Sequence, residues 1–286
     1  GLFGCFRTAG PRFPWGLDLF PLYRDGRGEA RDPVYAILPG RIVHINTSAG
    51  LSSYGRYVVV MHDRHRPAFH TLYAHLASVP RDLKVGQRVA AGQVIATMGR
   101  SAAGYTIPRS RAHVHLEMGF RLTDRFAGWF DRQDFGSDNH HGAYNGMNLV
   151  SWDPLAFYEA VRDGRIGSVE QFLAGLEPAC TLRVYSGGVP DFVRRYPDLV
   201  RSRDFSIDDI VAWEVTFNAY GVPFAWLPRY GAENLDGDPG DIEVLAYDRD
   251  RIEAVTCRQT LLFEGKRLRL GGTLSTILEL LFGFDL

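Results

Sequence analysis

The alternation of apolar and polar residues is clearest over residues 111–117, Arg-Ala-His-Val-His-Leu-Glu. A period of two is typical of a half-buried strand, so the three apolar residues are expected to face a core. His113, His115 and Glu117 then share the opposite face. Two imidazoles two residues apart on a strand can serve one metal ion or one bound water. Glu117 either belongs to the same site or pairs with a nearby arginine.

Similar short runs precede this stretch at residues 41–45, 57–62, 69–75 and 88–98, each bounded by Gly, Pro, Asn or Asp. Many short strands with regular turns predict an antiparallel β-rich domain. Helices are expected over residues 154–162, where Pro follows an Asp N-cap, and 168–176, which begins with a capping-box pattern.

The remaining residues, 179–286, predict a smaller α+β domain. Two further helices are expected, at residues 191–200 and 273–282. The expected strands lie at residues 181–186, 210–219, 223–227, 242–247, 252–263 and 267–270.

The composition is that of a globular protein, with 286 residues, 45% of them hydrophobic, and a formal net charge of −1. No Lys/Arg run points to nucleic acid or an anionic membrane, and no apolar run has the length of a membrane span. No signal peptide is recognisable at the start, which is a Gly and leaves the compartment open. Cys5, Cys180 and Cys257 lack metal-type spacing; a Cys180–Cys257 disulfide and three separate thiols both remain open.

Seven motifs that occur in one order carry a family resemblance. They are Gly16-Leu17-Asp18, residues 34–43, residues 54–60, Thr-Leu-Tyr-Ala-His-Leu at 71–76, Val-Gly-Gln-Arg-Val at 85–89, Gly-Gln-Val-Ile at 92–95 and His-Val-His-Leu-Glu at 113–117. In this order they resemble the lysostaphin-type (LytM-like) zinc endopeptidases of bacterial cell walls. The resemblance covers residues 10–158 and implies a LytM-like peptidase fold with an inserted loop at about 123–148, then a helical connector at 159–178.

The resemblance implies zinc as the cofactor and assigns roles to four residues. Asp18 and His115 look like zinc ligands, His113 like the general base, and His75 like the group that supports the polarised carbonyl. Pro14 stands where the family has its first ligand histidine. Because proline has no side-chain donor atom, one of three expected protein ligands is missing and zinc affinity should fall.

A substitute ligand could come from His140 or His141 in the inserted loop, or from Cys5. The interpretation we favour for that loop is a solvated lid. Tyr73, Arg109 and Arg111 are candidates for the substrate groove, with the arginines suited to a carboxylate on a stem peptide.

Two functions follow from the resemblance. The first is a zinc metalloendopeptidase that acts on peptidoglycan cross-link or stem peptides in the periplasm or the extracellular cell envelope. The second is a non-catalytic module of the same fold that binds peptidoglycan peptides or a cell-wall enzyme. A fold retained only as a scaffold is a third possibility. The four polar residues at the site favour the first function, and Pro14 opposes it.

Overall fold

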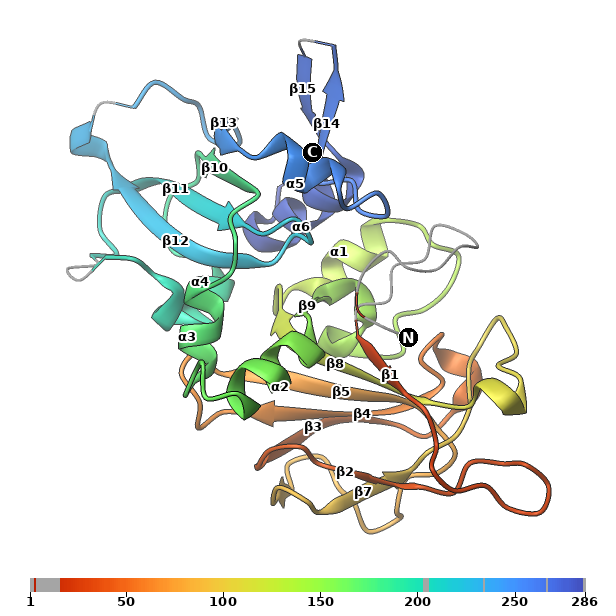
Figure 1. The fold of residues 1–286 in the computed structure, drawn as a ribbon. Coiled ribbons are helices and arrows are strands. Elements are labelled where there is room, and N and C mark those ends of the chain that lie inside the picture. Colours follow the sequence, from red (N-terminus) through yellow and green to blue (C-terminus); the bar gives the residue numbers. More distant parts are fainter. Residues whose placement is uncertain (1–2, 4–15, 203–205, 234, 266, 285–286) are drawn as a thin grey trace. The chain divides into compact units, whose positions relative to one another are not determined.

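The structure is a computed structural model that describes residues 3, 16–202, 206–233, 235–265 and 267–284 (Figure 1). Among these, residues 3, 16–120 and 137–159 form one compact unit, and residues 121–136 and 160–284 form a second. Pro14 and Cys5, which the sequence analysis singled out, lie outside the described residues.

The first unit is built on a seven-stranded sheet. Its strands follow the order β1-β8-β5-β4-β3-β6, and β9 pairs with β8. The neighbouring strands of that order are antiparallel, as the alternating pattern predicts. A separate antiparallel pair joins β2 and β7. The strands are β1 (Leu17–Leu19), β2 (Pro33–Tyr35), β3 (Gly40–Asn46), β4 (Arg56–His62), β5 (Phe69–Leu76), β6 (Arg88–Val89), β7 (Val94–Thr97), β8 (Val114–Arg121) and β9 (Leu149–Trp152).

Both faces of this sheet are covered. One core cluster includes Val58, Tyr73 and Leu116, and a second, on alternate positions of the same strands, includes Val59 and Leu72. The second cluster also contains residues of the 137–159 segment, which returns to the sheet through β9. Strand β8 is therefore buried along almost its whole length, not half-buried as its alternation predicts. The polar face of β8 is an interior surface.

The segment predicted as an inserted loop, residues 123–148, contains regular structure. Helix α1 (Phe126–Arg132) buries Phe126, Trp129 and Phe130, whose i, i+3, i+4 spacing places them on one helical face. Two 3₁₀ turns follow, η3 (Gly142–Tyr144) and η4 (Gly146–Asn148). The prediction of a single solvated loop was wrong for the α1 portion, because the aromatic spacing outweighs the surrounding polar residues.

The second unit has the mixed character that the sequence predicts. An antiparallel sheet runs in the order β12-β11-β10-β13, with a separate hairpin β14-β15. The strands are β10 (Cys180–Val184), β11 (Ile210–Phe217), β12 (Pro223–Tyr230), β13 (Ile242–Tyr247), β14 (Leu261–Glu264) and β15 (Arg267–Leu270). The remaining helices are α2 (Pro154–Arg162), which begins in the first unit, α3 (Val169–Ala174), α4 (Asp191–Arg195), α5 (Arg249–Glu253) and α6 (Gly272–Phe282), with short turns η1 (Ala49–Leu51), η2 (Arg109–Arg111), η5 (Pro197–Leu199) and η6 (Gly231–Glu233).

The strand predicted at 252–263 was wrong over most of its length. Residues Arg249–Glu253 form helix α5, and strand β14 begins only at Leu261. The Asp248 side chain accepts a hydrogen bond from the Arg251 backbone N–H at 3.0 Å, which caps the helix. This local cap starts a helix where the apolar residues alone suggest a strand.

The cysteines do not form the pair that the sequence left open. Cys180 is a buried free thiol on β10, whereas Cys257 is disulfide-bonded, so the two are not joined to each other. Burial raises the pKa of the Cys180 thiol to about 12. Among the described helices, none is long and apolar enough to cross a membrane.

Candidate functional site

Three neighbouring strands bring the predicted site residues together in the first unit. On β1, Asp18 lies directly opposite His115 of β8, and Ala74 of β5 lies opposite His115 on the other side. Directly opposed residues in an antiparallel pair project to the same face. Asp18, His115 and the end of β5 therefore meet, although 97 residues separate Asp18 from His115 in the sequence.

Gly16 allows β1 to approach β8 closely enough for this contact. A Cβ built on Gly16 would lie 2.2 Å from the carbonyl oxygen of Leu116, which no real side chain tolerates. The glycine two residues before Asp18 is thus a packing requirement of the β1–β8 pair.

Asp18, His115 and Glu117 form a chain of hydrogen bonds. The Asp18 Oδ1 lies 2.8 Å from His115 Nδ1, and Glu117 Oε1 lies 3.1 Å from His115 Nε2. Glu117 also accepts from the hydroxyls of Tyr54 (2.6 Å) and Ser151 (3.2 Å). The three central side chains are buried, with Glu117 only 1% exposed. Both nitrogens of His115 thus face carboxylate oxygens, an arrangement that suits an imidazolium with two N–H donors.

The electrostatics of this chain follow from its geometry. Burial alone would lower the pKa of His115, but the hydrogen bonds and charges of Asp18 and Glu117 outweigh burial and raise it to about 9. For Glu117, burial acts to raise the pKa, and the stronger combined effect of His115 and the Tyr54 hydroxyl leaves it below its ordinary value. With its pKa raised to about 9, His115 is expected to be protonated at neutral pH between the carboxyl groups of Asp18 and Glu117.

His75 and His113 form a second, neighbouring pair. Their ring centroids lie 4.8 Å apart in an edge-to-face arrangement. His113 Nδ1 lies 2.7 Å from the Arg111 carbonyl oxygen, and His75 Nδ1 lies 2.9 Å from the Ser101 carbonyl oxygen. A carbonyl can only accept, so each Nδ1 carries the hydrogen.

The protonation and backbone of His75 are both unusual. Burial, with the positive charges of the neighbouring histidines, lowers the pKa of His75 to about 3, so its ring is neutral and its Nε2 is an acceptor. Its backbone has a φ of +61°, a left-handed conformation that non-glycine residues rarely adopt. The His75 N–H donates to the Tyr54 carbonyl at 2.8 Å, which holds this turn at the end of β5.

Two exposed aromatic rings flank the histidine pair. The Phe20 ring lies 6.3 Å from that of His113, and Phe20 is 56% exposed. The Tyr105 ring lies 6.4 Å from that of His75, and Tyr105 is 39% exposed. Apolar walls beside a few polar groups are the usual composition of a ligand site.

The three groove candidates are placed differently from one another. Tyr73 is 1% exposed and packs in the core on the opposite face of the sheet, where its hydroxyl accepts from the Ile37 N–H. Arg109 is exposed and pairs with Glu29 at 2.8 Å. Arg111 is also exposed and contributes its carbonyl to His113. Tyr73 is thus a core residue, and only the two arginines lie at the surface.

The inserted segment brings neither histidine to Asp18 as a substitute ligand. His141 is buried, its Nε2 donates to the Leu51 carbonyl at 2.8 Å, and its ring packs against His44 and Tyr57. His140 is exposed.

The described residues do not supply a zinc site. Asp18 Oδ1 and His115 Nδ1 are close, and His113 Nε2 lies 3.5 Å from Asp18 Oδ1. Nevertheless, no group of three His, Cys, Asp or Glu side chains in the described part of the chain is arranged to hold a metal ion. Catalytic zinc is normally held by three protein ligands. The donor set described here therefore does not fit the metal that the resemblance implies.

Sequence reasoning missed the partners that complete this network. The sequence left Glu117 either in the site or paired with an arginine, and the structure places it in the site, where it binds His115, Tyr54 and Ser151. The alternation that puts Glu117 beside His115 was a usable signal, but Ser151 arrives through β9, which no local pattern connects to β8.

In the first unit an antiparallel sheet thus brings Asp18 of β1 and His115 of β8 together with His113, which directly precedes β8. Residues 24–125, about a third of the chain, match the model for Peptidase family M23. The match begins after Asp18, which lies outside it. No curated protein matches the chain.

Several solved structures are similar to the chain. The catalytic domain of the antimicrobial peptidase lysostaphin from Staphylococcus simulans is 19% identical, over 56% of this chain and 89% of that one, with a TM-score of 0.35. The whole of lysostaphin from Staphylococcus simulans is 17% identical, over 85% of this chain and 93% of that one, also with a TM-score of 0.35. The catalytic domain of a variant of the prophage-encoded M23 protein EnpA from Enterococcus faecalis is 21% identical, over 41% and 76%, with a TM-score of 0.31.

Proposed function

We propose that the M23 domain of this chain binds peptidoglycan peptides in the bacterial cell envelope without using the zinc-dependent hydrolysis of its family. The observation that carries this proposal is the hydrogen bonding of the His115 ring. Both of its ring nitrogens face carboxylates, Asp18 at 2.8 Å and Glu117 at 3.1 Å. Asp18 Oδ1 and His115 Nδ1 therefore hydrogen-bond to each other.

The sequence supports the same conclusion at position 14. A proline stands where the family has its first ligand histidine, and a pyrrolidine ring has no lone pair to offer a metal. With a carboxylate and an imidazole as the only remaining members of the family's ligand set, a zinc ion would lack the third ligand of a catalytic site.

Peptide binding requires hydrogen-bonding groups and apolar surface, and the surroundings of the histidines provide both. His75 presents an acceptor nitrogen, and Phe20 and Tyr105 supply exposed aromatic surface on the two sides of the histidine pair. Backbone amides of a peptide can donate to such acceptors while its apolar side chains cover the rings. The envelope location and the peptidoglycan ligand come to this chain from its family and are part of the proposal.

Zinc metalloendopeptidase activity is the second candidate. It is favoured by the short distances from Asp18 Oδ1 to His115 Nδ1, 2.8 Å, and to His113 Nε2, 3.5 Å. In that reading Asp18 and His115 are two zinc ligands, His113 is the base and His75 supports the transition state. A third ligand would then have to come from outside the described residues.

Metal analysis and peptide-binding measurements on the full chain distinguish the two candidate functions. We expect the protein, purified without chelator and refilled with zinc, to hold no stoichiometric zinc, to leave cell-wall peptides uncut, and to bind isolated peptidoglycan. Phe20→Ala and His75→Ala should weaken that binding, whereas His140→Ala, at an exposed histidine outside the site, should not. Tight zinc binding that His115→Ala abolishes, together with hydrolysis, would establish the peptidase instead.

Pro14→His supplies a complementary test. If one ligand is what the site lacks, this variant should gain zinc binding. A gain of both zinc binding and hydrolysis would show that the remaining residues are arranged to support hydrolysis. The parent protein would then be inactive because it lacks one ligand histidine.

A further inference from the structure

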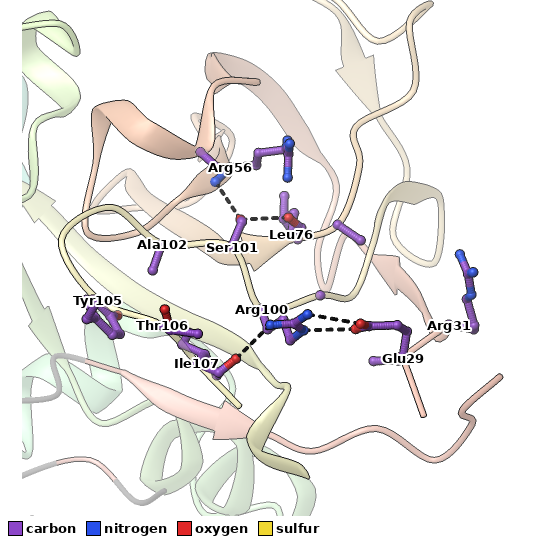
Figure 2. A pocket seen from close by; sticks show the side chains of 14 residues that line it. Glu29, Arg31, Arg56, Leu76, Arg100, Ser101, Ala102, Tyr105, Thr106 and Ile107 are labelled. Atoms are coloured by element: carbon purple, nitrogen blue, oxygen red, sulfur yellow. Dashed lines mark hydrogen bonds and ion pairs between the residues drawn. The ribbon is translucent and has the colours of Figure 1, made fainter. Parts of the chain in front are cut away.

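One wall of a pocket of about 460 Å³ (Figure 2) also hydrogen-bonds to the two histidines. That wall is the segment Gly99–Ser101, which lines the pocket. The Gly99 carbonyl accepts from the His113 backbone N–H at 3.2 Å, and the Ser101 carbonyl accepts from His75 Nδ1 at 2.9 Å. A ligand in this pocket would therefore contact the same backbone segment and the same Tyr105 that neighbour the histidine pair.

The pocket is lined by three arginines and one glutamate, so its walls carry a positive balance. Arg100 forms a two-pronged pair with Glu29 at 2.9 and 3.0 Å, and its third nitrogen donates to the Ile107 carbonyl. Arg31 pairs with Asp25 at 2.6 Å. These contacts neutralise two of the three arginines and the glutamate.

Arg56 is the lining arginine without an acidic partner in the described part of the chain. Its Nε donates to the Thr47 carbonyl at 3.0 Å, which leaves both terminal nitrogens of the guanidinium available. Figure 2 shows Arg56 and Arg100 on opposite sides of Ser101. The exposed Thr106 hydroxyl also lines the pocket and adds a neutral donor.

The backbone fixes Arg56 in this position. Its N–H donates to Ser101 Oγ at 2.9 Å, and Ser101 Oγ donates to the Leu76 carbonyl at 2.7 Å. The preceding Gly55 has a φ of +62°, and a Cβ on it would lie 2.1 Å from the Ser101 carbonyl oxygen. The start of β4 can approach the wall only with glycine at this position, which places Arg56 at the pocket rather than in open solvent.

From this arrangement we propose that the pocket binds a carboxylate of a short peptide through the Arg56 guanidinium, next to the histidine site. Two terminal N–H groups of a guanidinium match the two oxygens of a carboxylate in a planar, two-pronged contact. The proposal rests on the proposed function, because it names the part of the bound peptide that fixes its position. The carboxylate can be the chain terminus or an acidic side chain, and the two sources share this chemistry.

Small synthetic peptides test the pocket on the full chain. The probes are N-acetyl-alanyl-alanine, its C-terminal amide, and N-acetyl-glutamyl-alanine amide, which carries only a side-chain carboxylate. Binding is followed by the NMR shifts of the backbone amides over residues 99–107. We expect at least one acid to bind about tenfold more tightly than the neutral amide, as one charged hydrogen-bonded contact supplies. Which acid shows the preference identifies the source of the carboxylate.

Variants assign the preference to Arg56. Arg56→Gln should abolish it, and Arg56→Lys should keep part of it, because a lysine retains the charge without the planar fork. Arg81→Gln, which removes one exposed positive charge outside the pocket, should leave it unchanged. Unchanged amide shifts elsewhere in the first unit show that Arg56→Gln is folded.

Equal binding of acids and amide, a preference that survives Arg56→Gln, or no shift with any probe would overturn the pocket proposal. These outcomes are distinct from failure of the proposed function, which is measured on isolated peptidoglycan with Phe20→Ala and His75→Ala. An acid preference that depends on Arg56 supports the pocket even if peptidoglycan is not bound.

Discussion

Glu117→Gln should lower the stability of the first unit by about 2–3 kcal/mol in chelator. The carboxylate is 1% exposed and accepts from His115, Tyr54 and Ser151. A hydrogen bond to a charged group contributes about 1.5–3 kcal/mol, and a neutral one about 1 kcal/mol. Glutamine keeps the size and keeps an oxygen at the Oε1 position, so the Tyr54 and His115 bonds survive in weakened, uncharged form.

Two features of the site limit the expected loss of stability. The amide NH₂ would take the Oε2 position beside Ser151, whose hydroxyl can accept as well as donate, so no polar group is stranded. Asp18 still pairs with His115 at 2.8 Å, so the imidazolium keeps one counter-charge. The loss should therefore stay below the 3–5 kcal/mol, approximately, that follows complete breakage of a buried pair.

Hydrogen exchange of the amides in β5 and β8 measures this loss, because it reports the opening of the first unit separately from that of the second. Asp82→Asn is the control, since it removes one negative charge from an exposed residue of the same unit. A change for Glu117→Gln within about 0.5 kcal/mol of the control would contradict this prediction, because surface substitutions commonly have effects of that size.

Three further outcomes are expected. Gly16→Ala should destabilise the first unit and detach β1, since its Cβ would meet the Leu116 carbonyl at 2.2 Å, and thermal unfolding of the variant should begin earlier. Burial acts to raise the pKa of Glu214, but hydrogen bonds from two arginines lower it below 4.5 overall. Below that pH the unfolded chain binds more protons, so stability should fall as pH falls, with a shallower slope in Glu214→Gln. Cys180, buried and with its pKa raised to about 12, should escape alkylation in the native protein at pH 8 and react after unfolding, as mass spectrometry can show.

The sequence was informative wherever a local pattern had one structural solution. The alternation at residues 113–117 predicted a strand with its polar side chains on one face, and in β8 His115 and Glu117 contact each other while Val114 and Leu116 join a core cluster. His113 lies just before the strand. The Ser168 capping pattern predicted helix α3, whose N-cap side chain accepts from the Gln171 N–H. Apolar runs in the second half predicted β10 to β13 within a few residues.

Local patterns failed where a distant segment decides the environment. Tyr73 alternates with Leu72 and Ala74 along β5, and nothing local states which face belongs to the core around Leu116. The helix at Arg249–Glu253 depends on a single Asp248 cap that outweighs the strand-like residues after it. The burial of the β8 polar face comes from the 137–159 segment, whose return to the sheet is a tertiary contact.

From the sequence, the antiparallel β-rich domain, the polar residues that could share one face of β8 and the proline at position 14 could all be predicted or identified. Side-chain periodicity and turn residues act over a few positions, so these features can be recognised before the fold is known. The tertiary structure was needed to show that Asp18 and Glu117 hold His115 from both sides and that Arg56 lines a pocket without an acidic partner among the described residues. Such contacts join residues that are far apart in the chain. Their energies depend on the burial of these side chains, which occurs only when the complete sheet has formed.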